Sequence, residues 1–119
     1  MSACGIGLDL LEIERMERAL ARRPGLATRL FHPGELEYSH DRARPGQHLA
    51  ARFCAKEAVS KALGMDVFAP LDVEVVGGGG EVALALHGAA AARAGELGVA
   101  VGLSMTHTRG MAAAVAILQ

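Results

Sequence analysis

Aromatic residues are scarce in this chain of 119 residues, which has one tyrosine, three phenylalanines and no tryptophan. Proteins that bind single-stranded nucleic acid commonly stack the bases on aromatic side chains, and those that bind duplexes commonly carry a surplus of positive charge. Neither feature is present here, because the formal net charge is −1. The composition therefore argues against a nucleic-acid-binding protein.

Cysteines and long apolar runs are also few. The two cysteines, Cys4 and Cys54, cannot form a disulfide framework and lack the close spacing of a zinc site, so we expect free, buried thiols. No apolar run approaches the roughly 18 residues that a membrane-spanning helix needs. Asp9 interrupts the apolar N-terminal segment, which has no basic residue before it, so we expect no signal peptide and a cytoplasmic location.

The chain is instead rich in small and aliphatic residues, and 51% of it is hydrophobic. Alanine, leucine and valine must therefore build the core, and small residues favour close helix packing. A chain of this length is expected to form one domain and to bury roughly two-thirds of its unfolded surface.

The order of elements predicts an α+β domain with a small antiparallel sheet packed with a long central helix, and not a doubly wound parallel sheet. The pattern of apolar residues, glycines and prolines predicts a strand, then helices, a hairpin, a helix and a second hairpin. The expected ranges are a strand to about residue 10, helices at 11–23, 27–31, 34–42 and 47–63, strands at 71–76 and 81–86, a helix at 88–98, and strands at 99–107 and 110–118.

The expected long helix contains R-F-C-A-K-E-A-V-S-K-A-L-G, which is nearly all apolar yet carries Lys56, Glu57 and Lys61. Glu57 and Lys61 share one face at about 100° per residue, and a surface pair worth about 0.3–0.5 kcal/mol is one interpretation. In such apolar surroundings a carboxylate otherwise needs a cation as partner, either Lys61 or a metal ion. Lys56 points toward another edge, where we expect it to be solvated or to face a phosphate.

Asp9 follows two glycines, Gly5 and Gly7, near the end of the expected first strand. It can be read as the N-cap of the next helix, which is the simpler interpretation. It can also be read as a ligand of Mg²⁺, which is held by one or two carboxylates together with substrate phosphates. Asp9 and Glu57 together would supply two such carboxylates. The glycines do not complete a dinucleotide-binding G-x-G-x-x-G motif, and close packing of the strand also explains them.

The segment L-S-M-T-H-T-R-G ends an expected strand with several polar side chains. Alternation places Ser104 and Thr106 on one face of the strand and Met105 and His107 on the other. A single histidine at a strand end is more often a hydrogen-bonded structural residue than a catalyst. No G-x-S-x-G motif is present, so a serine hydrolase is not indicated.

Three arginines, Arg15, Arg18 and Arg22, share a narrow face of the first expected helix. Such a stripe is usually a solvated face beside glutamates. On a nearly neutral protein it can instead dock an acidic protein partner.

Three motifs occur in a characteristic order: G-I-G-L-D-L-L-E-I-E-R from Gly5, F-C-A-K-E-A-V-S-K-A from Phe53, and S-M-T-H from Ser104. In this combination the chain resembles the holo-acyl-carrier-protein synthase family, the short 4'-phosphopantetheinyl transferases, over essentially its whole length. The K-E-x-x-x-K motif downstream of G-x-D is the specific part, and the third motif is looser. The resemblance implies a single domain of this family over residues 1–119.

The resemblance implies a Mg²⁺-dependent enzyme that moves the 4'-phosphopantetheine group of coenzyme A to a serine of apo acyl carrier protein. Adenosine 3',5'-bisphosphate is then the leaving group. By analogy, Asp9 and Glu57 bind the metal, Lys61 contacts the phosphate, and Ser104 and His107 help to bind coenzyme A. The general base stays open between Glu57, acting through a metal-bound water, and His107.

The resemblance also implies that Arg15 and its helix, with Arg18 and Arg22, meet the acidic helix of the carrier, and that the protein is a homotrimer with active sites between subunits. Two positions depart from the family pattern, which more often has serine at Thr106 and an acidic residue at Thr108. Glu35 resembles a recurrent family glutamate to which we assign no role.

Two other functions stay possible at this point. One is a module that binds coenzyme A or a carrier protein without turnover. The other is a metal-dependent nucleotide pyrophosphatase, in which water replaces the serine of the carrier as the acceptor.

Overall fold

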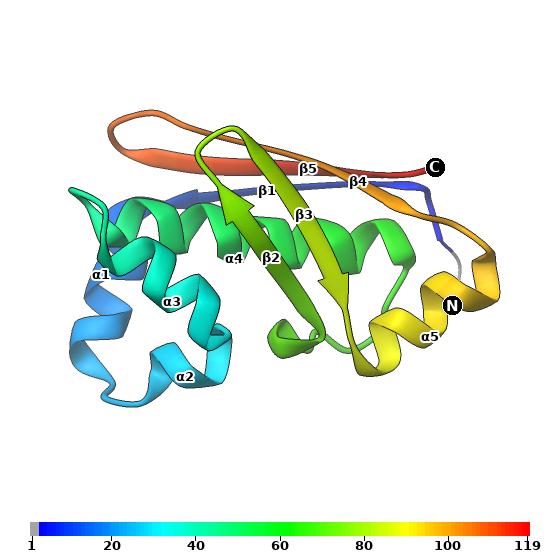
Figure 1. The fold of residues 1–119 in the computed structure, drawn as a ribbon, viewed down its shortest axis with the longest axis horizontal. Helices are drawn as coiled ribbons and strands as arrows, with labels where there is room; N and C mark the ends of the chain where they lie inside the picture. The colour runs from blue at the N-terminus through cyan, green and yellow to red at the C-terminus, as the bar shows by residue number, and fades with distance from the viewer. Residues whose placement is uncertain (1–2) are drawn as a thin grey trace.

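The computed structural model describes residues 3–119 and has an α+β fold built around one long helix, as Figure 1 shows. The expected fold class is thereby confirmed. The elements are β1 (Ile6–Glu12), α1 (Ile13–Arg22), α2 (Leu26–Leu30), α3 (Pro33–His40), α4 (Pro45–Leu63), η1 (Pro70–Asp72), β2 (Val73–Gly78), β3 (Glu81–Leu86), α5 (Gly88–Leu97), β4 (Val101–His107) and β5 (Met111–Leu118).

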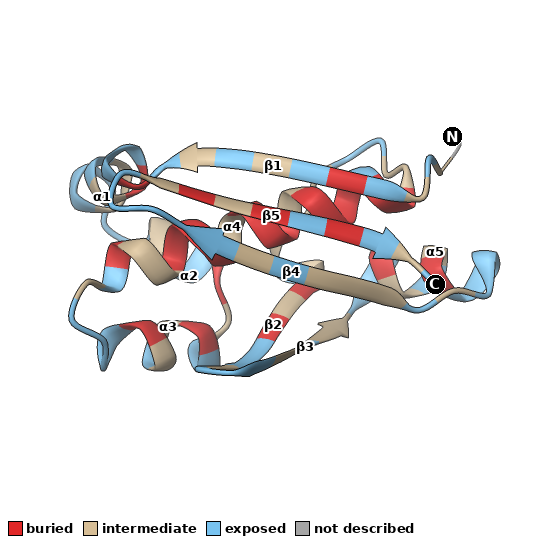
Figure 2. Ribbon diagram, turned by 90° about the horizontal axis from the view of Figure 1, so that it is seen from above, coloured by how far each residue is buried: buried red, intermediate tan, exposed pale blue. Residues whose placement is uncertain are grey.

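The strands form two antiparallel sheets. A three-stranded sheet has the order β1-β5-β4, and β2 and β3 form a separate hairpin. In Figure 2 the first sheet is seen with β5 in the middle and with β1 and β4 on its two edges. Asp9 of β1 pairs with Ala114 of β5, which pairs in turn with Met105 of β4. Asp9 and Met105 therefore lie at the same level on the two edge strands.

Helix α4 lies against the inner face of the three-stranded sheet and also contacts α1, α3 and β2. Most of its residues are buried, and the face that carries Phe53, Glu57 and Lys61 is the more open one. A helix that buries most of its surface is largely apolar, and this explains why its sequence does not look like that of a surface helix. The helix ends, as expected, where Gly64 adopts a left-handed conformation with φ of 69°.

Strand β1 approaches α4 very closely at Gly7. A Cβ atom at this position would lie 1.8 Å from the backbone oxygen of Ala58, so only glycine fits there. The interpretation of Gly7 as a close-packing position is confirmed. This contact places the side chain of Asp9, two residues further along the same face of β1, next to α4.

The interpretation of Asp9 as a helix N-cap is wrong. Strand β1 continues to Glu12, which pairs with Met111 of β5 and is itself the N-cap residue of α1. The pairing with β5 keeps residues 10–12 extended, and Asp9 therefore lies inside the strand. The thiols also differ from expectation, since Cys54 is buried but Cys4 is exposed. No helix within residues 3–119 is long and apolar enough to cross a membrane.

Candidate active site

Asp9 and Glu57 line one cavity of about 450 Å³ between β1, α1 and α4. The strand supplies Asp9 and the middle of the buried helix supplies Glu57, and the close contact at Gly7 brings the two elements together. The remaining walls are mostly apolar, and Arg15 of α1 stands at one side. The structure therefore joins the two carboxylates that the sequence separates by almost half the chain.

Lys61 lies one turn beyond Glu57 on α4 and contacts Asp9. Its Nζ is 3.5 Å from Oδ1 of Asp9 and donates a hydrogen bond of 3.0 Å to the backbone oxygen of Leu8. Within the described residues this ammonium pairs with Asp9 and not with Glu57, so the expected surface pair between Glu57 and Lys61 is not formed. The side chain of Lys61 is about half exposed (53%), which leaves it free to meet a ligand.

The site carries more negative charge than one ammonium can offset. Burial raises the pKa of Glu57, and the neighbouring Asp9 raises it further, while Lys61 acts in the opposite direction. Two neighbouring carboxylates are a suitable donor set for a hard divalent cation, which binds oxygen ligands and offsets their charge. The residues present therefore fit a magnesium ion.

The nearby thiol of Cys54 is not a nucleophile. Burial, together with the charges of Asp9 and Glu57, raises its pKa to about 12. The Sγ atom lies 3.6 Å from the backbone oxygen of Ala112, to which the thiol donates. A thiol that stays protonated is unreactive, so Cys54 does not supply a nucleophile to this cavity.

The prediction that Lys56 is solvated or faces a phosphate is wrong. Its side chain is fully buried, and its Nζ lies 2.8 Å from Oε1 of Glu35, which is also buried. The ammonium further donates to the backbone oxygens of Pro70 and Val73. Because these acceptors use all three of its protons, Lys56 is a structural residue and not a contact to coenzyme A.

Glu35 is the residue that sequence reasoning missed. Its Oε1 accepts a hydrogen bond of 2.9 Å from the backbone N–H of His32, and its Oε2 accepts one of 3.0 Å from that of Val75. With Lys56 it connects the start of α3, strand β2 and helix α4. Burial lowers the pKa of Lys56, and the hydrogen bond and charge of Glu35 oppose that shift. The resemblance of Glu35 to a recurrent family glutamate was a signal in the sequence, but it did not indicate Lys56 as its partner.

His107 and Ser104 do not join this site within one chain. They lie on β4, at the opposite edge of the sheet from β1 (Figure 2). The Nε2 atom of His107 is 3.0 Å from the side-chain amide nitrogen of Gln47, and the ring borders a different cavity of about 260 Å³ with Tyr38 and Arg52. Ser104 is exposed and pairs with Val115 on the outer face, so the expected alternation of Ser104 and His107 is confirmed.

The three arginines of α1 form one exposed surface. Arg15, Arg18 and Arg22 line a shallow hollow of about 590 Å³ together with Arg23. Arg15 also lines the cavity of Asp9 and Glu57. The basic surface and the acidic cavity are therefore neighbours, which allows one partner molecule to touch both.

Known proteins match this chain in sequence over nearly its full length. The model of the 4'-phosphopantetheinyl transferase superfamily matches residues 5–115. The holo-[acyl-carrier-protein] synthase of Moorella thermoacetica is 44% identical over 117 residues, covering 95% of this chain and 91% of the relative. That of Streptomyces coelicolor is 47% identical over 122 residues, covering 100% and 99%.

Solved structures match the fold as well. The ACPS–CoA complex of Chronobacterium ammoniagenes has a TM-score of 0.84 and 30% identity, covering 99% of this chain and 98% of that one. The acyl carrier protein synthase of Mycobacterium tuberculosis has a TM-score of 0.72 and 34% identity, also covering 99% and 98%. Sequence and fold agree along the whole molecule, and the chain belongs to the 4'-phosphopantetheinyl transferase superfamily.

Proposed function

We propose that this chain transfers the 4'-phosphopantetheine group of coenzyme A to a serine hydroxyl of an apo acyl carrier protein and releases adenosine 3',5'-bisphosphate. Relatives that match the chain almost from end to end are holo-[acyl-carrier-protein] synthases. The observation that carries the proposal is the cavity in which Asp9 and Glu57 meet beside Arg15 of the basic surface. The cavity can hold the pyrophosphate of coenzyme A while the basic surface beside it holds the carrier.

In this proposal Asp9 and Glu57 hold Mg²⁺, which neutralises the pyrophosphate of coenzyme A when bound. Lys61 leaves Asp9 and places its ammonium on the phosphate, where negative charge develops as the leaving group departs. Phosphoryl-type transfer needs positioning and charge neutralisation more than an enzyme nucleophile. This requirement agrees with the inert thiol of Cys54 and with an acceptor serine that belongs to the carrier.

The carrier docks on α1 in this proposal. Arg15, Arg18 and Arg22 are exposed, and an acidic helix laid against them would be held by complementary charge. Because Arg15 reaches both this surface and the cavity, a carrier docked there can present its acceptor serine to Asp9 and Glu57. A cytoplasmic location is part of this proposal, because its substrates are coenzyme A and an acyl carrier protein.

We also propose a homotrimer with active sites between subunits. The outer face of the three-stranded sheet exposes a row of large apolar side chains: Ile6 (55%), Leu8 (64%), Leu10 (62%), Val115 (36%) and Ile117 (49%). A contiguous apolar surface of this kind is normally covered by a partner. Since β1 and β4 are the two edges of one sheet, contact between copies can bring His107 and Ser104 of one chain to Asp9 and Glu57 of the next. There they would help to bind coenzyme A.

One experiment separates the transferase from its rivals. The chain is incubated with coenzyme A, Mg²⁺ and an apo carrier protein, and the carrier is weighed by mass spectrometry while released nucleotide is measured. A carrier heavier by one phosphopantetheine group supports the transferase. Nucleotide release without a carrier would indicate a pyrophosphatase, and an unchanged carrier without nucleotide release would indicate a binding module.

A further inference from the structure

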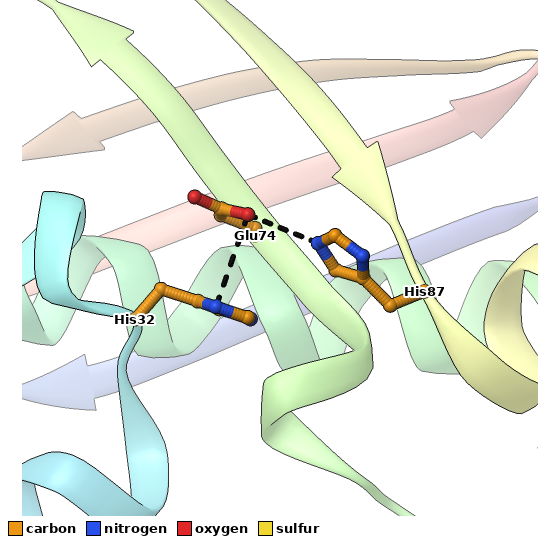
Figure 3. A group of neighbouring side chains, drawn as sticks. All are labelled: His32, Glu74 and His87. Carbon is orange, nitrogen blue, oxygen red and sulfur yellow. Dashed lines mark hydrogen bonds and ion pairs between the residues drawn. The ribbon is translucent and has the colours of Figure 1, made fainter.

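A second group of chemically active side chains lies away from the active site. It consists of His32, Glu74 and His87, which point toward one another in Figure 3. His32 is the N-cap residue of α3, Glu74 lies on β2, and His87 is the N-cap residue of α5. The donor atoms of the three side chains all lie within 4.8 Å of one another. Nothing in the proposed transfer reaction uses them.

The distances around Glu74 are short. Its Oε1 lies 2.9 Å from Nε2 of His87 and 3.8 Å from Nδ1 of His32. A tetrahedral ion with ligands at about 2.0–2.1 Å separates neighbouring ligand atoms by roughly 3.3 Å, which falls between these two values. The side chain of His87 is the most exposed of the three, at 45%. It can therefore turn slightly toward an ion without disturbing the core.

A backbone carbonyl orients His32 for coordination. Its Nε2 lies 2.7 Å from the backbone oxygen of Leu71, and because a carbonyl can only accept, this nitrogen carries the proton. The lone pair of the neutral ring is then on Nδ1, the atom that faces Glu74. A hydrogen bond from the second ring nitrogen to a carbonyl is the usual way in which proteins fix a metal-binding histidine.

The donor set selects a metal class different from that of the active site. Two imidazole nitrogens and one carboxylate suit Zn²⁺ and similar transition ions, and three protein ligands leave one position for water. Asp9 and Glu57 offer only oxygen, which suits Mg²⁺. The buried ammonium of Lys56 pairs with Glu35 and not with Glu74, so Glu74 remains available to an ion.

We propose that His32, Glu74 and His87 form a binding site for a divalent transition-metal ion, with Zn²⁺ as the preferred ion. Bound there, the ion joins the start of α3, strand β2 and the start of α5. His32 is far from Glu74 and His87 in sequence, so the unfolded chain does not hold the three ligands together. Metal binding therefore stabilises the folded state.

The test is Zn²⁺ titration by calorimetry, with the full chain saturated with Mg²⁺ so that oxygen sites are occupied. The native chain should bind equimolar Zn²⁺, and at a free concentration of about 100 times Kd the unfolding midpoint should rise by roughly 10 °C. His87→Ala and Glu74→Gln should each weaken binding by at least about 100-fold, because each removes a ligand. Visible absorption of bound Co²⁺ reports on tetrahedral geometry.

Two variants serve as matched controls. His40→Ala removes an exposed histidine at the end of α3 that is outside the cluster, and Glu57→Gln alters the oxygen site, so both should keep the affinity of the native chain for Zn²⁺. Melting in the presence of a chelator should give His87→Ala the same midpoint as the native chain within a few degrees. Native affinity in the His87→Ala variant, or a Kd in the millimolar range for the native chain, would overturn the proposal.

Discussion

Two neighbouring residues of α4, Lys56 and Glu57, enter opposite kinds of surroundings. Lys56 points into the core, where Glu35 and two backbone oxygens satisfy all of its protons. Glu57 points into a cavity, beside a second carboxylate and within reach of one half-exposed lysine. One step along a helix turns the side chain by about 100°. Here that turn separates a closed site, in which the hydrogen bonds of Lys56 and Glu35 are complete, from an open site, in which Asp9, Glu57 and Lys61 can still meet a ligand.

Structural and functional charges on a largely buried helix differ in whether their hydrogen bonds are complete. A charge whose hydrogen bonds are complete has nothing left to offer a ligand, and its loss disturbs the fold. Repulsion between two neighbouring carboxylates raises the free energy of the empty site, and binding of a cation lowers that free energy. The same helix therefore supports the fold with one residue and the reaction with the next.

The largest effect is expected for Glu57→Gln, which changes the open site alone. It keeps the size of the side chain and removes one of the two carboxylates, so kcat for transfer to the carrier should fall at least about 1000-fold. The unfolding midpoint should stay equal or rise, because a partly buried carboxylate beside a second carboxylate is removed. Carrier mass spectrometry and thermal melting check the two parts, and a fully active variant would refute the metal assignment.

The next effect should be on stability, from Lys56→Met. The change leaves the carboxylate of Glu35 buried without its cation, which costs about 3–5 kcal/mol of unfolding free energy. The double variant Glu35→Gln with Lys56→Met is the matched control and should regain most of the loss, because no charge is left buried. Urea denaturation measures all three chains. If Lys56→Met were as stable as the native chain but inactive, Lys56 would belong to the active site after all.

Lys61→Met removes the lysine that contacts Asp9 at the cavity of Asp9 and Glu57. Activity should fall about 100-fold, as for the loss of one donor to a developing negative charge. Stability should change by only about 0–1 kcal/mol, because the ammonium of Lys61 is half exposed and can be solvated without its partner. Steady-state kinetics with varied coenzyme A checks the first value. A large loss of stability with unchanged kcat would reverse the roles of the two lysines.

The sequence predicted that Asp9 and Glu57 come together, but it did not predict the buried pair of Lys56 and Glu35. The helical range of α4 and its end at Gly64 follow from local chemistry, and the motifs singled out Asp9 and Glu57. The burial of Lys56 depends on Glu35, which approaches from another helix, and a helical wheel gives only the direction of a side chain. The same limit explains the N-cap interpretation of Asp9, because the extension of β1 to Glu12 depends on pairing with β5, near the end of the chain.

The smallest effect is expected outside both networks, at Arg18 on α1. Arg18→Glu should raise KM for the carrier about 10-fold through lost charge complementarity, while KM for coenzyme A and the melting temperature stay unchanged. The exposed arginine of α2 gives a matched control, since Arg29→Glu makes the same charge change away from the hollow. Added salt should reduce the difference between the native chain and Arg18→Glu, because screening weakens both attraction and repulsion. If Arg29→Glu impaired the carrier equally, overall charge and not a docking surface on α1 would govern recognition.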